Sequence, residues 1–130
     1  MYELTMIERL FSSSNYLAAK QMLDAASLRQ EAIANNIANI ETPGYKRMDL
    51  QKDFAEQFAT HVRGGTLKQA PAPSLAEDSR STSLRKDGNN VELDKELLAM
   101  SKNGLEYEAM TEFVSGSLRQ LRMAITGRTV

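Results

Sequence analysis

The last third of the chain carries an apolar stripe that constrains the fold more than any other feature. The stripe advances by alternating steps of four and three residues without a break, the heptad spacing that keeps one face of a helix against a partner. Its members are Leu93, Leu97, Met100, Gly104, Tyr107, Thr111, Val114, Leu118, Leu121 and Ile125. A helix from Asp94 to Thr126 would be about 50 Å long. The sequence therefore predicts a mainly α fold whose other long helix lies along this one.

A second helix is predicted from Tyr16 to about Asn39, after a cap at Ser14 or Asn15. Its apolar positions also advance by three and four, with only Gln30 breaking the pattern. They are Tyr16, Ala19, Leu23, Ala26, Ile33, Ile37 and Ile40. We expect the two helices to form an antiparallel, coiled-coil-like hairpin. The chain then divides into an N-terminal helical segment, 1–41, a connector, 42–93, and a C-terminal helix, 94–130, with the first and last forming one helical core.

The segment Thr42-Pro43-Gly44-Tyr45 is predicted to end the first helix in a type II turn. Pro43 disfavours helical geometry at Thr42 before it. It also presets the backbone of the first central position, and Gly44 accepts the positive φ of the second. The chain should therefore leave the helix within a few residues.

Three asparagines, Asn35, Asn36 and Asn39, occupy the last two turns of the first helix, where asparagine is a poor helix former. Capping and local backbone hydrogen bonds explain Asn39 well, and the pair 35–36 less well. The alternative is that these amides bond to neighbouring chains, as a buried asparagine fixes the register of a coiled coil. The sequence leaves both hypotheses open.

The connector is expected to be mostly irregular, with one short helix near its start. Leu50, Phe54, Phe58 and Val62 recur every fourth residue, and Gly64-Gly65 follows them. This spacing predicts one apolar helical face that ends at the glycines.

Two short runs farther along, 66–68 and 82–85, could pair as strands and give the connector a small β element. The turn Asp87-Gly88-Asn89-Asn90 then precedes the long helix, for which Asp94 is the expected N-cap.

Composition argues against several classes of function. The 16 basic and 17 acidic residues nearly cancel, so no general attraction to nucleic acid is indicated. The chain has no cysteine and a single histidine, His61, so no cofactor or metal site is predicted. Glu106, Glu108 and Glu112 are expected on an exposed helix side without a pocket, so we predict no enzymatic activity. The first residues lack the apolar core of a secretory signal, and no run approaches the roughly 20 apolar residues of a membrane span.

Two segments carry a resemblance to a known family. Residues 34–46, Ala-Asn-Asn-Ile-Ala-Asn-Ile-Glu-Thr-Pro-Gly-Tyr-Lys, resemble the N-terminal signature of the bacterial flagellar axial proteins, the rod and hook family. Residues 87–94, Asp-Gly-Asn-Asn-Val-Glu-Leu-Asp, followed by a long helix, are similar to the proximal rod proteins of that family. The likeness covers about the first and last thirds of the chain.

The resemblance implies a structural subunit of the flagellar basal-body rod, the drive shaft for motility. It further implies export by the flagellar type III apparatus without a cleavable signal, and a place in the periplasmic rod. The implied partners are other copies of the chain, other rod proteins, the adaptor between rod and membrane ring, and the export apparatus.

The residues themselves also favour an assembly subunit. A hairpin would leave a second apolar set, Leu98, Leu105, Met110 and Phe113, facing outward, and helices depend on packing for most of their stability. The predicted assembly interface comprises Ile33, Asn35, Asn36, Ile37, Asn39, Ile40, Leu97, Met100, Gly104, Tyr107, Val114, Leu118, Leu121 and Ile125, with Thr42, Pro43, Gly44 and Tyr45 as the turn motif. The alternative is a freestanding helical adaptor or secretion chaperone, which would show the same stripes without that turn.

Overall fold

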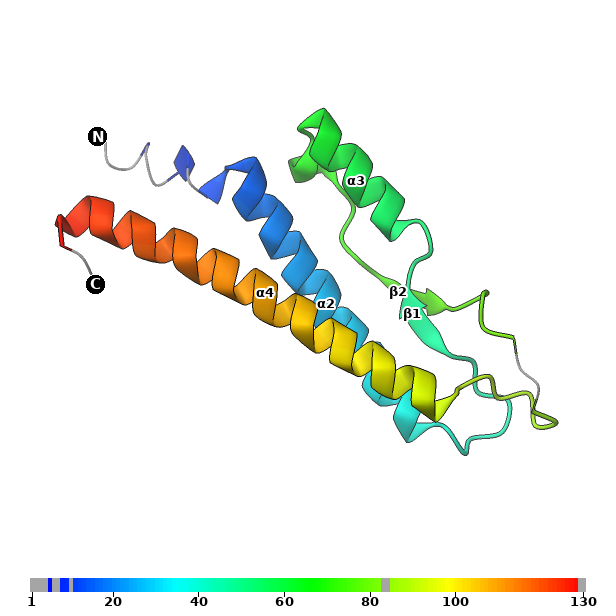
Figure 1. Cartoon of the computed structure of the whole chain (residues 1–130). Coiled ribbons are helices and arrows are strands. Elements are labelled where there is room, and N and C mark those ends of the chain that lie inside the picture. The colour runs from blue at the N-terminus through cyan, green and yellow to red at the C-terminus, as the bar shows by residue number, and fades with distance from the viewer. Residues whose placement is uncertain (1–4, 6–7, 10, 83–84, 129–130) are drawn as a thin grey trace.

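The computed structural model describes residues 5, 8–9, 11–82 and 85–128. Two long helices, α2 (Ser14–Ala38) and α4 (Leu93–Thr126), lie side by side and run antiparallel. Figure 1 shows that the start of α2 and the end of α4 lie at one end of this hairpin, whereas the connector leaves from the other. The predicted mainly α fold with two long antiparallel helices is confirmed.

The helix boundaries differ slightly from those predicted, because the caps are different residues. Ser13 caps α2, since its hydroxyl oxygen accepts a hydrogen bond from the backbone N–H of Tyr16 at 3.3 Å. Farther along the chain α4 begins at Leu93, with Glu92 rather than the expected Asp94 at the N-cap position. The acidic Asp94 lies in the first turn instead, where a negative charge favours the helix dipole.

The face that α2 buries consists mainly of small side chains. Its buried residues are Ala19, Ala25, Ala26, Ala32, Ile33 and Asn36. Alanines let two helices approach closely, but each one removes little apolar surface from water. The hairpin therefore gains modest apolar stabilisation for its length.

The face that α4 turns toward α2 differs from the predicted stripe. Its two buried residues are polar, Glu96 and Asn103. The amide nitrogen of Asn103 donates to the carbonyl oxygen of Ala26 at 2.8 Å and to Oε1 of Gln30 at 3.0 Å. With 3.6 residues per turn, these two residues share one side of α4 with several half-buried residues, and together they form its inner face. The inner face comprises Glu96, Ala99, Asn103, Met110, Val114, Ser117 and Leu121.

Most of the predicted heptad stripe consequently flanks the inner face and stays exposed. Hydrophobic spacing alone passes over polar residues, so it could not identify Glu96 and Asn103 as the positions that face α2. The exposed large apolar residues of α4 are Leu93, Leu97, Leu98, Met100, Leu105, Tyr107, Phe113, Leu118 and Ile125.

The connector contains a two-stranded antiparallel sheet, but not the one predicted. Strand β1 (Met48–Leu50) pairs with β2 (Leu75–Glu77), with Asp49 opposite Ala76. The predicted run 66–68 instead falls on a 3₁₀ turn, η1 (Leu67–Gln69), whose Leu67 is buried. Residues 83–84 of the other predicted run lie outside the described residues.

The short connector helix α3 spans Phe54–Gly64 and stands apart from the hairpin in Figure 1. Gly65 ends it with a φ of 65°, as the glycine pair predicted. Leu50 does not belong to this helix, because it lies in β1 and is buried there. The fourth-residue spacing extended the predicted helix by one turn too many.

Candidate functional site

The turn predicted at residues 42–45 is present and redirects the chain. Gly44 has a φ of 74°, and the N–H of Tyr45 donates to the carbonyl oxygen of Thr42 at 3.3 Å. Asn39 serves the end of α2 locally, because its amide nitrogen donates to the Asn35 carbonyl oxygen at 2.8 Å. Capping thus accounts for Asn39.

Asn36 is fully buried, and its side chain links the end of α2 to β1 and α4. Its amide nitrogen donates to the carbonyl oxygen of Met48 at 2.8 Å and to Oε2 of Glu96 at 3.2 Å. Its amide oxygen accepts from the Met48 N–H at 2.8 Å and from the Tyr45 hydroxyl at 3.2 Å. In this structure Asn36 therefore acts as a polar register device within one chain.

Arg47 forms ion pairs with acidic residues of the connector and of α4. Its guanidinium pairs with the buried Glu96, with Asp78 at 2.8 Å and with Asp49 at 3.1 Å. Burial alone would lower the pKa of Arg47, but the hydrogen bonds to Glu96 and Asp49 outweigh burial, so the pKa is raised. Burial, and then the nearby Glu96 carboxylate, also raise the pKa of the Tyr45 hydroxyl. Glu96 consequently sits between Asn36 and Arg47 as a paired carboxylate.

Asn89 connects the turn at residues 87–90 to the turn at residues 42–45. It is fully buried, and its amide nitrogen donates to the carbonyl oxygens of Asn39, Ile40 and Thr42 at 2.9, 3.0 and 2.9 Å. The N–H of Gly44 also donates to the Asp87 carbonyl oxygen at 2.8 Å. Asn89 therefore caps the end of α2 from about fifty residues away along the chain.

The two segments that carried the family resemblance thus meet in one place. We call Asn36, Tyr45, Arg47, Asn89 and Glu96 the polar cluster. Sequence reasoning identified the turn but missed Arg47, Asn89 and Glu96 as its partners. In the sequence, these three residues stand out only as polar residues close to two turns that contain glycine. Their partners lie far away along the chain, so no local pattern indicates the pairing.

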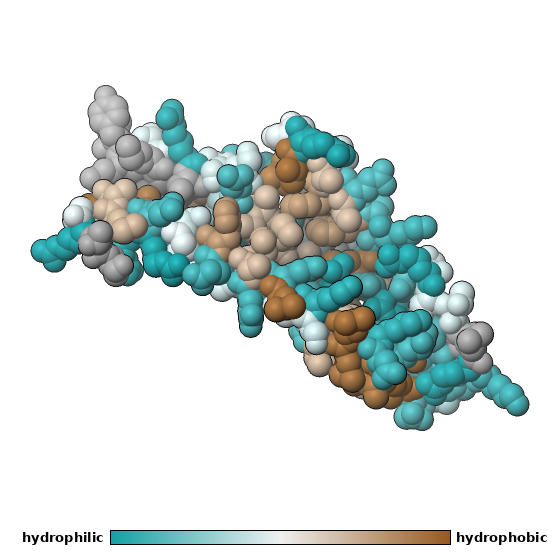
Figure 2. Space-filling model, in the orientation of Figure 1, coloured by the Kyte–Doolittle hydropathy of each residue, from teal (hydrophilic) through white to brown (hydrophobic). Residues whose placement is uncertain are grey.

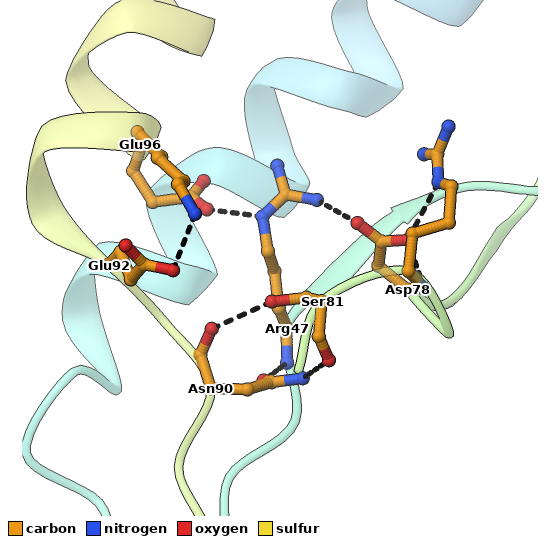
Figure 3. A pocket seen from close by; sticks show the side chains of 8 residues that line it. Arg47, Asp78, Ser81, Asn90, Glu92 and Glu96 are labelled. Atoms are coloured by element: carbon orange, nitrogen blue, oxygen red, sulfur yellow. Dashed lines mark hydrogen bonds and ion pairs between the residues drawn. The ribbon is translucent and has the colours of Figure 1, made fainter. Parts of the chain in front are cut away.

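A polar pocket of about 200 Å³ opens beside the cluster (Figure 3). Arg47 lies between Glu96 and Asp78, and the amide nitrogen of Asn90 donates to the Ser81 carbonyl oxygen at 2.9 Å. Burial alone would raise the pKa of Asp78, but hydrogen bonds from Arg80, with the charges of Arg80 and Arg47, lower it. The carboxylates of this pocket are paired with arginine or lysine side chains. These ion pairs hold the connector and the hairpin together.

The predicted interface residues fall into three groups. Ile33 and Asn36 are buried inside the subunit, so they stabilise the hairpin in this structure. Ile37, Asn39, Ile40, Val114 and Leu121 are half-buried. Asn35, Leu97, Met100, Gly104, Tyr107, Leu118 and Ile125 are exposed. Figure 2 shows hydrophobic surface on the visible side of the hairpin, including the end where α4 begins.

The described residues include no group of three His, Asp or Glu placed to hold a metal ion. Among the helices of the described part of the chain, none is long and apolar enough to cross a membrane.

Comparison with known proteins identifies the family. Residues 22–46 match the family described as "Flagella basal body rod protein". The chain is 32% identical to the flagellar basal body rod protein FlgB of Bacillus subtilis (strain 168), over 81% of this chain and 88% of that protein. It is 30% identical to the FlgB proteins of Aeromonas hydrophila, over 81% and 87% of the two chains, and of Escherichia coli (strain K12), over 77% and 84%. The chain belongs to the FlgB family of flagellar basal body rod proteins.

Proposed function

We propose that the chain is a structural subunit of the proximal rod, which polymerises through its two long helices as part of the flagellar drive shaft. The observation that carries the proposal is the apolar surface of α4. Its polar residues Glu96 and Asn103 face α2, whereas most of its large apolar side chains remain exposed. A helix that faces its own partner with polar residues keeps its apolar surface available for other molecules.

The total accessible surface supports this proposal. The chain exposes 9250 Å² at a mass of 14.5 kDa. A compact monomer of that mass exposes about 6,900 Å². A specific interface covers about 800 Å² on each partner. The surplus of roughly 2,300 Å² is therefore enough for contacts with more than one neighbour, as an open helical assembly requires.

The nature of the partners follows from family membership. Interaction with other components of the rod is implied by the family itself. We propose that the partners include copies of this chain, other rod proteins, the adaptor between rod and membrane ring, and the export apparatus during secretion. The proposed location is the periplasmic part of the basal body, reached without a cleavable signal peptide.

The freestanding adaptor or secretion chaperone is the less favoured alternative. The similarity to FlgB proteins extends over most of the chain, and the turn at residues 42–45 is fixed by the polar cluster rather than left free. Neither feature is required of a chaperone.

Leu118→Asp tests the proposal. Leu118 is 42% exposed in the subunit, so the variant should still fold. In a rod, the substitution removes apolar burial of roughly 1.5–3 kcal/mol per copy, and it places an unpaired charge in a contact. We expect secretion to continue but isolated basal bodies to lack the variant.

Gln120→Asp provides the matched control, because it adds the same charge at an exposed position two residues away on another side of α4. This variant should assemble and support swimming. Normal amounts of Leu118→Asp in intact rods would show that the exposed stripe is not an assembly contact.

A further inference from the structure

Two grooves run along the hairpin, one on each side of the line where α2 and α4 touch. The first has a volume of about 190 Å³ and is partly covered by α3, since Phe54 and Phe58 line it together with Met22 and Met110. The second has a volume of about 380 Å³ and is lined only by residues of the two long helices. We call it the open groove, and its lining residues are Ala26, Ser27, Gln30, Met100, Asn103, Gly104 and Tyr107.

Small residues line part of the open groove, and two larger side chains flank them. Gly104 and Ser27 are small, and a Cβ atom added to Gly104 would meet nothing within 4 Å. Met100 and Tyr107 flank this point and are 37% and 46% exposed. Asn103, which is 3% exposed, keeps a buried amide oxygen that has no hydrogen-bond partner among the described residues. Buried polar atoms are nearly always partnered, so the groove is incomplete in the isolated subunit.

The side of α4 that faces away from α2 carries two leucines that are largely exposed to solvent. Leu98 and Leu105 are 59% and 68% exposed, and both point away from α2, because they lie about half a turn from the buried Glu96 and Asn103. Around them on this face lie Asp94, Ser101, Lys102, Ala109 and Glu112. Two exposed leucines among mostly polar neighbours are suited to insert into a groove between two helices.

The two features match in length. Leu98 and Leu105 are seven residues apart, and so are the flanking residues Met100 and Tyr107 of the groove. Each pair spans about 10 Å along α4. One subunit therefore carries both halves of the contact, because the leucines lie on α4 and the groove lies between α2 and α4 on another side.

We propose that Leu98 and Leu105 of one copy insert into the open groove of a second copy of this chain. The contact is heterologous, because each copy uses its leucines toward one neighbour and its groove toward another. Such a contact repeats without closing and extends as a helical array. This inference rests on the proposed rod function and assigns the surface through which copies meet.

Disulfide cross-linking tests the contact, because the chain has no cysteine of its own. The double variant Ser27→Cys/Leu105→Cys places one thiol at the groove and one on the leucine face. Within one subunit Ser27 lies on α2 and Leu105 lies on the side of α4 that faces away from α2. Their Cα atoms are therefore roughly 10 Å or more apart, beyond the 7 Å limit for a disulfide. Oxidation of isolated basal bodies with copper phenanthroline should therefore give a ladder of dimers, trimers and higher species on a non-reducing gel.

Two controls use the same chain. Ser27→Cys/Arg122→Cys moves the second thiol to an exposed polar position about 25 Å farther along the same helix and should remain largely monomeric. Leu105→Cys alone should also remain monomeric, because a heterologous contact does not bring two copies of Leu105 together. A dimer of Leu105→Cys alone would indicate a two-fold contact and overturn the proposal.

The outcomes separate this inference from the proposed function. The variants are expressed in a flagellated bacterium from which the gene for its own copy of the protein has been deleted. Swimming and rod content are then measured in parallel. If Ser27→Cys/Leu105→Cys enters rods but gives no ladder, or no more cross-linking than the Arg122 control, the groove contact is wrong and the rod function stands. If the unsubstituted chain itself fails to enter rods, the proposed function is wrong.

Discussion

Asn36→Ala is predicted to destabilise the subunit far more than Asn35→Ala, although the two asparagines are neighbours on the same helix. Asn36 is fully buried and makes four side-chain hydrogen bonds, to both backbone groups of Met48, to the Tyr45 hydroxyl and to the Glu96 carboxylate. The side chain of Asn35 is exposed. Replacing each of them with alanine therefore compares the loss of a buried hydrogen-bonding side chain with the loss of a solvent-exposed one.

The size of the effect follows from the bonds that are lost. A hydrogen bond to a charged group contributes about 1.5–3 kcal/mol, and a neutral one about 1 kcal/mol. Loss of one charged and three neutral bonds, partly offset by water or local relaxation, gives a decrease of about 3–5 kcal/mol in the free energy of unfolding. Asn35→Ala should leave this free energy unchanged or raise it by about 0.5 kcal/mol, because alanine is the better helix former.

Urea denaturation of the purified subunit, followed by far-ultraviolet circular dichroism, measures both variants. With a slope of about 2 kcal/mol per molar urea, the midpoint of Asn36→Ala should fall by roughly 1.5–2.5 M at an unchanged slope. A decrease below about 1 kcal/mol, or equal losses for the two variants, would refute the conclusion that Asn36 works inside the subunit.

Three further predictions concern the turn, the charges of the polar pocket and the open groove. Gly44→Val forces a β-branched residue to a φ of 74° and should cost about 1–3 kcal/mol in urea denaturation; equal stability would contradict the turn geometry. The pKa of Asp78 is lowered in the folded state, so its contribution is present above the ordinary aspartate pKa and is lost as the pH falls through the folded value. Asp78→Asn should therefore lose less stability than the unsubstituted chain between pH 7 and about pH 3, and an unchanged pH profile would contradict this assignment. Gly104→Ala should stabilise α4 by up to about 1 kcal/mol, because the added methyl group meets nothing in the subunit, yet it should lower rod assembly; normal rods would argue against the groove contact.

The distribution of polar and apolar residues suits a structural subunit of the flagellar basal body rod. Polar bonds at Asn36 and Asn103 set the register of α2 against α4. A buried hydrogen-bonding group specifies one alignment, because every other alignment leaves it unpaired. The subunit thus defines its own hairpin with polar contacts and keeps much of its apolar surface exposed.

The sequence by itself determined the features that depend on local physics. The heptad spacing of residues 93–125 established a long helix, because helical periodicity is a property of neighbouring residues. Pro43 and Gly44 established where α2 must end, since their backbone preferences act within the turn itself. The turn also lies in one of the two segments, 34–46 and 87–94, that carried the family resemblance.

Only the tertiary structure decided which face of α4 packs against α2 and how the connector is held. Glu96 and Asn103 are poor candidates for a buried face when read alone. They become suitable because Asn36, Arg47 and the Ala26 carbonyl oxygen supply partners from distant parts of the chain. The β1–β2 pairing and the capping of α2 by Asn89 have the same origin. A buried polar group is stable only with its partner present, and no local pattern records where that partner lies.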